Sequence, residues 1–320
     1  MLKLHILKED IRKEGLKIKI LVTGAAGFIG SHIVDKYVEL GHEIVVIDNL
    51  SSGNKQNINP KVKFYETDIT DLEKIRKIIL DEKPDIINHH AAQISVTKSI
   101  QEPELDFKVN VEAFENIINT AKQANTKKII FPSSAAVYGD TKELPTKEDT
   151  KKEPMSPYAE NKLKAEQLLI NSNINFTILR YSNVYGPRQI LTSGEGAVVA
   201  IFCTKLLKQQ IPTIFGDGEQ LRDFVFVEDV TEANILALDK GDNKIMNIST
   251  GKGDTVNELF NILKEISEFE SKPNYENPRK GDILKSYLDN TKAKETLNWK
   301  PTTDFKDGLK KTFEWFKENK

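Results

Sequence analysis

Tyr158 and Lys162 stand four residues apart in the segment 156–163, which is the spacing of one helical turn. A phenol and an ammonium at this spacing lie on the same face of a helix. A phenol has a pKa near ~10 in water, so it is a poor base at neutral pH unless its anion is stabilised. A positive charge at about 4 Å in an effective dielectric of about 20 supplies roughly 4 kcal/mol, or about 3 pKa units. The pair is therefore a candidate general base, although the same spacing is also common on solvated helices.

A glycine-rich turn near the N-terminus has the context of a dinucleotide site. The run 18–22 predicts a buried strand, and residues 31–40 have helical spacing. Between them, Gly24, Gly27 and Gly30 follow the spacing G-x-x-G-x-x-G, which differs from the commoner G-x-G-x-x-G. Gly24 and Gly27 would let backbone amides approach a pyrophosphate, and Gly30 would let the helix pack closely on the strand. The alternative is an ordinary tight strand-to-helix turn.

The second predicted strand, 43–47, ends at Asp48. A carboxylate at this position can accept hydrogen bonds from the adenosine ribose hydroxyls and would repel a 2′-phosphate. No arginine follows in residues 49–55, where Lys55 is the only cation. We therefore expect NAD rather than NADP, the alternative being an aspartate that only caps a turn.

Composition narrows the class of protein. The chain has 320 residues, of which 38% are hydrophobic and 29% charged, and its net charge of −2 favours neither a nucleic-acid nor a membrane-surface partner. No apolar stretch approaches the about 20 residues of a membrane span. Cys203 is the only cysteine, so we expect no intrachain disulfide, a packing role for this thiol and a reducing, cytoplasmic compartment. The five histidines lack the spacing of a zinc site, and we expect no metal.

Residues 1–16 precede the first predicted strand and alternate Leu or Ile with charged residues. They contain no apolar core of secretory length, so we expect no signal peptide. We treat 1–16 as an N-terminal extension without an assigned function.

Strand and helix candidates alternate through the first part of the chain. Further strands are expected at 62–65, 86–88, 128–131 and 176–179, and helices at 71–80, 104–124 and 157–171. This alternation predicts an α/β fold with a doubly wound parallel (Rossmann) sheet over 17–180, in which ligands bind at the carboxyl ends of the strands. Proline and glycine become dense after 186 and strands shorten, which predicts a smaller C-terminal α+β substrate domain over 181–320.

The features above, together with several motifs further along the chain, give this sequence a resemblance to the extended short-chain dehydrogenase/reductases. Within them it is most similar to the NAD-dependent epimerase/dehydratase family and its UDP-glucose 4-epimerase group. The resemblance runs from Lys17 to the C-terminus and implies that 224–248 returns to the Rossmann domain. Besides the features above, it is carried by Asp68-Ile69, His90-Ala91-Ala92-Gln93, Asn110, Ser133–Gly139, Tyr181–Arg188, Gly216-Asp217-Gly218, Arg222-Asp223 and Arg279–Asp282.

The resemblance implies NAD as a permanently bound cofactor and a UDP-sugar as the substrate. It places the cofactor contacts at Gly24, Gly27, Phe28, Ile29, Gly30, Asp48, Asn49, Asp68, Ile69, His90, Ala91, Ala92, Asn110, Tyr158, Lys162 and Tyr181. It places the substrate contacts at Ser134, Asn183, Val198, Phe215, Arg222, Arg279, Asp282 and Ser286.

In the implied chemistry the catalytic residues are Ser134, Tyr158 and Lys162. Tyr158 takes the proton of the sugar C4 hydroxyl while hydride passes from C4 to NAD, and Ser134 hydrogen-bonds the same oxygen. The 4-keto sugar then turns over, still held by its nucleotide, and receives the hydride on its other face. Arg222 and Arg279 would bind the diphosphate, the alternative being surface ion pairs with neighbouring aspartates.

Two departures from related patterns refine the expected reaction. Ala135 follows Ser134 where dehydratases and decarboxylases of the family usually carry an acid, which favours epimerisation. Ser286 stands where epimerases restricted to unacetylated sugars often carry a bulky tyrosine, so we expect UDP-N-acetylhexosamines also to be accepted.

Several alternatives stay open at this point. The chain could be another nucleotide-sugar enzyme of the extended class, such as a dehydratase, decarboxylase, reductase or different epimerase, or an NAD-binding regulator without catalysis. The sequence does not choose between UDP and dTDP or fix the sugar. Members of the family usually form homodimers in which two long helices of each subunit pack into a four-helix bundle. The resemblance therefore implies a homodimer through 104–124 and 157–171.

Overall fold

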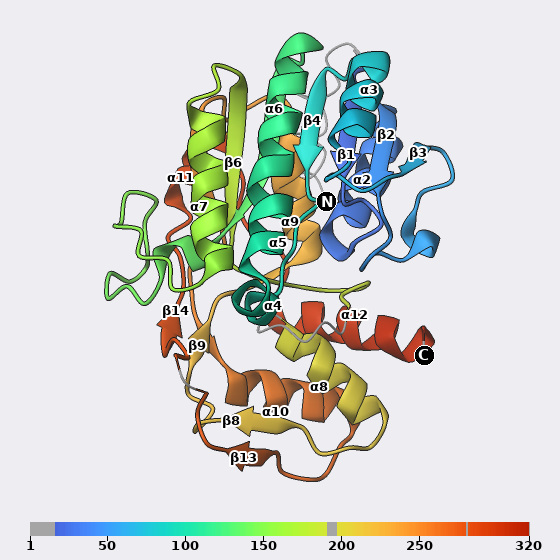
Figure 1. The fold of residues 1–320 in the computed structure, drawn as a ribbon. Helices are drawn as coiled ribbons and strands as arrows, with labels where there is room; N and C mark the ends of the chain where they lie inside the picture. Colours follow the sequence, from blue (N-terminus) through green and yellow to red (C-terminus); the bar gives the residue numbers. More distant parts are fainter. Residues whose placement is uncertain (1–16, 191–196, 280, 320) are drawn as a thin grey trace.

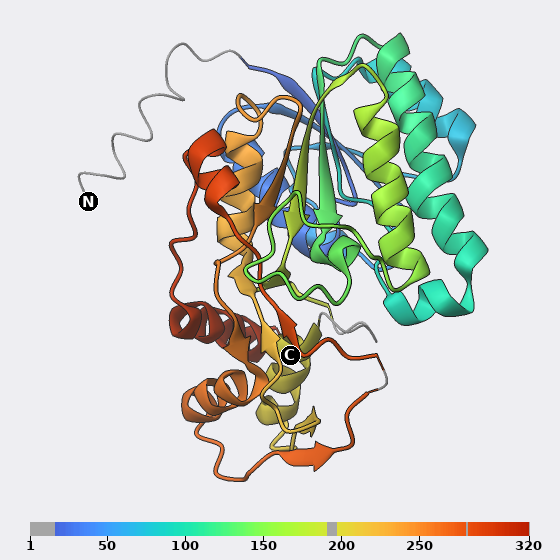
Figure 2. The same cartoon turned by 90° about the vertical axis from the view of Figure 1, so that its left-hand side faces the viewer.

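The centre of the computed structural model, which describes residues 17–190, 197–279 and 281–319, is a seven-stranded sheet (Figures 1 and 2). Its order is β11-β6-β5-β4-β1-β2-β3, and every neighbouring pair is parallel. The strands are β1 (Lys19–Thr23), β2 (Glu43–Asp48), β3 (Lys63–Glu66), β4 (Ile86–His89), β5 (Lys128–Ser134), β6 (Asn175–Tyr181) and β11 (Lys244–Ile248). The prediction of a parallel Rossmann-like sheet is confirmed.

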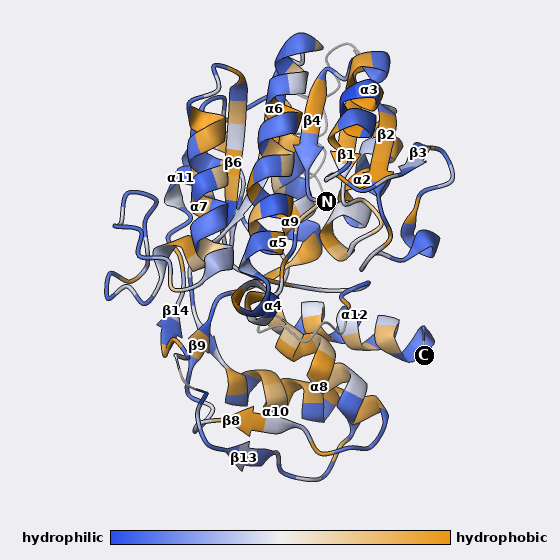
Figure 3. Ribbon diagram, viewed as in Figure 1, coloured by the Kyte–Doolittle hydropathy of each residue, from blue (hydrophilic) through white to orange (hydrophobic). Residues whose placement is uncertain are grey.

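Helices cover both faces of this sheet because its strands are apolar on both sides. Along β1, Ile20 and Val22 pack into one buried cluster, whereas Leu21 packs into another. The first cluster lies under α2 (Phe28–Glu39), α9 (Val227–Leu236) and α11 (Thr291–Leu297). The second lies under α3 (Leu72–Glu82), α6 (Ala113–Gln123) and α7 (Pro157–Ile170). Figure 3 shows β1 and β2 largely orange, while α3, α6 and α7 mix apolar and hydrophilic residues.

The helix predicted at 104–124 forms as one continuous helical segment that contains a π-helical turn. It comprises α5 (Pro103–Phe107), a π-helical turn at Lys108–Glu112 and α6, and is preceded by α4 (Val96–Gln101). Pi-helical turns are rare and occur often at functional sites. This one contains Asn110, one of the expected cofactor contacts.

The rest of the chain forms a smaller lobe at the carboxyl edge of the sheet, with its own apolar core. Apolar residues of three of its helices meet there around Phe202, Phe260 and Leu309. Its elements are β7 (Asn183–Tyr185), α8 (Val198–Leu207), β8 (Thr213–Phe215), β9 (Leu221–Arg222), β10 (Phe224–Phe226), β12 (Asp254–Thr255), α10 (Val256–Ser267), β13 (Asn274–Glu276), β14 (Lys285–Ser286) and α12 (Phe305–Glu318).

The chain passes between the two parts more than once. After β9, the short β10 pairs with β7, then α9 packs against α2 and β11 joins the large sheet beside β6. The chain then returns through α10 to the smaller lobe, and α11 packs on β11 before α12 ends in the lobe (Figure 2). Within 224–248, α9 and β11 therefore pack with the large sheet, whereas β10 pairs with β7.

Cys203 is fully buried in α8, and burial raises the pKa of its thiol to about 12, which suits the packing role expected for it. The predicted extension 1–16 lies outside the described residues. Across the described ranges, no helix combines the length and apolarity that crossing a bilayer requires.

Candidate active site

Residues expected to bind a cofactor gather at the carboxyl edge of the sheet. Gly24, Asp48, His90 and Ser134 end or directly follow β1, β2, β4 and β5, and Tyr181 ends β6. Because these strands are neighbours and parallel, their ends meet at one edge, where a doubly wound sheet binds ligands. Asp68 and Ile69 follow β3 at the same edge, and Ala91 and Ala92 follow His90.

The glycine turn leaves no room for side chains. Gly24 has φ +72°, and a Cβ there would lie 2.5 Å from the backbone nitrogen of Ala91. A Cβ at Gly30 would lie 2.4 Å from the carbonyl oxygen of Gly24. Gly27 caps α2 without a side-chain hydrogen bond, so the first amides of this helix, in the turn that includes Phe28 and Ile29, are left for a ligand. This cradle fits the pyrophosphate of a dinucleotide.

Three polar side chains next to the turn suit an adenosine ribose. Asp48 accepts hydrogen bonds from the backbone nitrogens of Ala26 at 2.9 Å and Leu50 at 2.8 Å, and burial raises its pKa. Asn49 donates to Asp68 at 2.7 Å. Burial acts to raise the pKa of Asp68, but hydrogen bonds from Thr70 and Asn49 bring it below its usual value.

His90 presents a neutral imidazole to the interior of the site. Burial and the positive charge of Lys162 together lower its pKa to about 3, although the neighbouring Asn234 side chain acts to raise it. Its ring stacks on Tyr181 with centroids 6.3 Å apart. Within the described part of the chain, His90 Nε2 is buried without a hydrogen-bond partner. An open hydrogen-bonding position at this edge fits a polar ligand better than a packed interior.

Helix α7 begins at Pro157, after Ser156 accepts a hydrogen bond from the backbone nitrogen of Ala159. This cap and the proline fix the start of the helix, which places Tyr158 in its first turn and Lys162 one turn later. Ser134 ends β5, and its hydroxyl lies near enough to the Tyr158 phenol to act on the pKa of that phenol. The structure thus brings Ser134 and Tyr158 together, with Lys162 on the same helix.

The charge state of the phenol differs from the simplest expectation. Burial and the negative charge of Asp106 together raise the pKa of Tyr158 to about 12, although the Ser134 hydroxyl acts to lower it. Lys162 donates to the carbonyl oxygen of Pro132 at 2.9 Å, and burial lowers its own pKa to about 8. The protein alone therefore keeps Tyr158 protonated, so its ionisation needs a further positive charge in the site.

Apart from Ser134, the expected substrate residues lie in the smaller lobe, and several of them contact one another. Arg222 of β9 forms an ion pair with Asp282, and the Arg279 guanidinium lies 4.0 Å from the centre of the Phe215 ring. Ser286 pairs with Arg222 in the β14–β9 ladder. Asn183 begins β7 and Val198 begins α8. The ion pair considered as the alternative for Arg222 does form, with Asp282.

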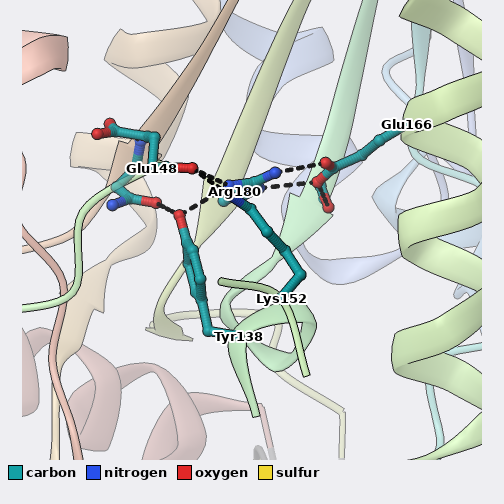
Figure 4. Close-up of polar contacts among 7 residues, drawn as sticks. Tyr138, Glu148, Lys152, Glu166 and Arg180 are labelled. Atoms are coloured by element: carbon teal, nitrogen blue, oxygen red, sulfur yellow. Dashed lines mark hydrogen bonds and ion pairs between the residues drawn. The ribbon is translucent and has the colours of Figure 1, made fainter. Parts of the chain in front are cut away.

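Sequence reasoning missed a group of buried charges behind the site. Arg180 of β6 donates to both carboxylate oxygens of Glu166, at 2.9 and 2.6 Å, and to the Tyr138 hydroxyl at 2.9 Å (Figure 4). Asp106 of α5 is fully buried as well. A charged residue inside an otherwise apolar strand, as Arg180 is in Phe176–Tyr181, was the available signal.

No three histidine, cysteine, aspartate or glutamate side chains within 17–190, 197–279 and 281–319 are grouped so that they could hold a metal ion. The ligand set of the site consists instead of backbone amides, hydroxyls and ionisable side chains at the sheet edge.

Comparison with known proteins agrees with this geometry. The model of the NAD dependent epimerase/dehydratase family matches residues 20–249. A protein of Methanocaldococcus jannaschii provisionally named UDP-glucose 4-epimerase is 46% identical over 94% of this chain and 99% of its own length.

Two solved structures are similar over nearly the whole chain. The UDP-glucose 4-epimerase of Thermotoga maritima, solved with UDP-glucose, superposes with a TM-score of 0.91 at 45% identity, covering 94% of this chain and 99% of that one. The UDP-N-acetylglucosamine 4-epimerase of Methanobrevibacter ruminantium, in complex with UDP-N-acetylmuramic acid, gives 0.90 at 36% identity, covering 95% and 99%.

Proposed function

This chain belongs to the NAD-dependent epimerase/dehydratase family, and from that premise we propose that it inverts C4 of a UDP-hexose with Tyr158 as the base. The sugars we propose are glucose and galactose and their N-acetylamino counterparts. The observation that carries the proposal is the meeting of Ser134 and Tyr158, with Lys162 one turn along α7, at the edge that holds the glycine cradle. The similarity to epimerases that act on UDP-sugars supports the substrate class.

NAD, when bound, supplies a hydride acceptor and donor and, in its oxidised form, a positive charge. The glycine cradle and the open amides of α2 would hold its diphosphate, and Asp48 its adenosine ribose. His90, Asn110 and Tyr181 border the nicotinamide half in this proposal. A carboxylate at Asp48 supports NAD over NADP.

The proton steps belong to three side chains. Tyr158 takes the proton of the C4 hydroxyl and later returns it, while the Ser134 hydroxyl hydrogen-bonds the same sugar oxygen. The Lys162 ammonium, held by the Pro132 carbonyl, stabilises the phenolate as it forms. Each proton transfer is reversible, which suits a reaction whose substrate and product differ only in configuration.

Substrate binding would exchange partners within the smaller lobe. A diphosphate offers Arg222 and Arg279 a doubly charged partner in place of Asp282 and the Phe215 ring. Asp282 is then free for the uridine ribose, and Phe215 and Val198 for the two faces of the uracil. Asn183 would add a contact to the diphosphate.

Ser286 supports acceptance of acetylated sugars, because its short side chain leaves space beside Arg222. The Ser286→Tyr variant should keep turnover of UDP-glucose and lose at least tenfold in kcat/KM for UDP-N-acetylglucosamine, since the added ring occupies that space. Steady-state assays with both substrates measure the ratio. A wild-type enzyme active on UDP-glucose alone contradicts this part of the proposal.

The base assignment is tested by Tyr158→Phe, which removes the titrating oxygen and keeps the ring. We expect loss of at least 10³-fold in turnover, as for removal of a positioned proton-transfer group, with NAD still copurifying.

Products from a panel of UDP- and dTDP-sugars are identified by chromatography. Normal turnover in the variant would refute the base, and net reduction of NAD would favour a dehydrogenase instead. An inactive wild type with bound NAD would favour a regulator.

A further inference from the structure

Asp106 is a fully buried carboxylate whose hydrogen bonds all come from side-chain amides. It accepts from Gln93 Nε2 at 2.7 Å, Asn110 Nδ2 at 3.0 Å and Asn161 Nδ2 at 2.8 Å. Amides solvate an anion but do not neutralise it, and an uncompensated buried charge is costly. Asp106 therefore needs a positive charge near it.

Each of the three donors belongs to a segment that carries a site residue. Gln93 follows the His90–Ala92 turn, and its backbone also exchanges hydrogen bonds with Asn110. Asn110 lies in the π-helical turn, and Asn161 lies on α7 directly before Lys162. The Asp106 carboxylate is thus hydrogen-bonded to the turn after β4, to the π-helical turn and to α7.

The balance of buried charges identifies its counter-charge. Lys162 has two buried carboxylates near it, Asp106 and Glu166, which both act to keep it protonated. Glu166 is already matched by Arg180 in a two-point ion pair (Figure 4). Lys162 is thus left as the cation that balances Asp106.

Within the described residues, the helices packed around this pair add no other buried ion. Burial lowers the pKa of both His89 and His90, so neither is charged at neutral pH, and burial raises the pKa of Tyr138 and Tyr181. The remaining charged groups on the helices packed around α7, and on α7 itself, are exposed to solvent: Lys98, Glu104, Lys108, Glu112, Glu115, Lys122, Glu160 and Lys164.

We propose that Asp106 is a positioning residue that holds Lys162 as the ammonium and sets the pH range in which Tyr158 acts as the base. The inference rests on the proposed function, because it concerns the base of that reaction. Asp106 makes no contact with the sugar in this scheme and acts through Lys162, Tyr158 and the three amides.

The direction of its effect follows from the sign of its charge. The negative charge of Asp106 raises the pKa of Tyr158 and, against burial, that of Lys162. Removing it lowers both. Activity that needs ionised Tyr158 then begins at lower pH, and activity that needs protonated Lys162 is also lost at lower pH.

The Asp106→Asn variant of the NAD-loaded enzyme tests this. Asn161 can turn its amide to present an oxygen, so all three hydrogen bonds survive while the charge is lost. We expect both limbs of the pH profile of kcat/KM to move down by about one pH unit. Asp106→Glu, which keeps the charge, should keep both limbs in place even where kcat falls. Loss of kcat in Asp106→Asn with both limbs unmoved overturns the proposal, since a purely structural role gives that result.

The pairing of charges is tested without turnover by thermal unfolding. Lys162→Met leaves Asp106 uncompensated and should lower Tm at pH 7. The double variant Asp106→Asn/Lys162→Met should melt higher than Lys162→Met, and this comparison holds even where Asp106→Asn alone fails to fold. A double variant that melts no higher than Lys162→Met overturns the pairing.

Failure of the inference and failure of the proposed function give different results. If Tyr158→Phe is inactive and the Asp106→Asn profile does not move, the base stands and only the role of Asp106 is lost. If Tyr158→Phe is active, the base is wrong whatever the Asp106 variants do, and the melting comparison still judges the charge pairing.

Discussion

For Tyr158, residue types and spacing predicted its position on a helix but not the protonation state of its phenol. The four-residue spacing correctly indicated that Tyr158 and Lys162 share one helix, and the glycine spacing indicated the tight turn at the sheet edge. Spacing alone does not report burial, which raises the pKa of the phenol and lowers that of the ammonium. The protonation of the pair therefore could not be predicted from the sequence, because it depends on Asp106 and Pro132, which lie far from the pair along the chain.

Removal of NAD should raise the pKa of Tyr158. The phenol of Tyr158 in the cofactor-free protein should lose its proton only near pH 12, whereas oxidised NAD brings a positive charge that should lower this pKa by at least 2 units, as for an opposite charge within a few ångströms. Ultraviolet difference titration of wild type against Tyr158→Phe isolates the one ring. Equal titration of the loaded and the cofactor-free protein would contradict the electrostatic role given to the cofactor.

At the scale of elements, the apolar strands and the segments between them were predictable because parallel strands buried on both faces read as continuous apolar runs. The π-helical turn within 104–124 could not be predicted, since apolar spacing continues on both sides of it. Glu166 and Arg180 were missed for a related reason. A charge on a helix usually faces solvent, and only the packing of α7 on β5 and β6 turns Glu166 inward.

The buried ion pair should matter for stability in proportion to its burial. Glu166→Gln leaves the Arg180 guanidinium with a neutral partner in the interior, and we expect a loss of about 3 to 5 kcal/mol in the free energy of unfolding. Urea denaturation measures it. The matched control is Asp81→Asn, which breaks the exposed pair with Lys77 and should cost no more than about 0.5 kcal/mol. Equal losses in the two variants would show that Arg180 is not held by this charge.

At the scale of the whole molecule, we propose that a second subunit would pack on the outer face of α4, α5 and α7. Phe107, on α5, is 36% exposed, and Ile100, on α4, is 62% exposed, both large for apolar side chains left to water. The Lys164 ammonium lies over the Phe107 ring at 5.4 Å, which joins this surface to α7. We expect two chains to pair here.

A charge on that surface should separate the subunits. Phe107→Asp should shift the molar mass seen by light scattering from that of two chains toward that of one, because the carboxylate would be buried without a partner. Ile211→Asp is the control, since Ile211 is 51% exposed but lies beyond α8 in the smaller lobe. A wild type with the mass of one chain, or a dimer unaffected by Phe107→Asp, would rule out this interface.

The repeated passage of the chain between the sheet and the smaller lobe limits how the protein can be recombined. A single junction at residue 181 would take β6 from one parent and its neighbour β11 from the other, and would split the α2–α9 contact in the same way. Sugar preference therefore cannot be transplanted between relatives as one contiguous block. It must be exchanged as separate inserts that spare α9, β11 and α11, or residue by residue among the proposed substrate contacts.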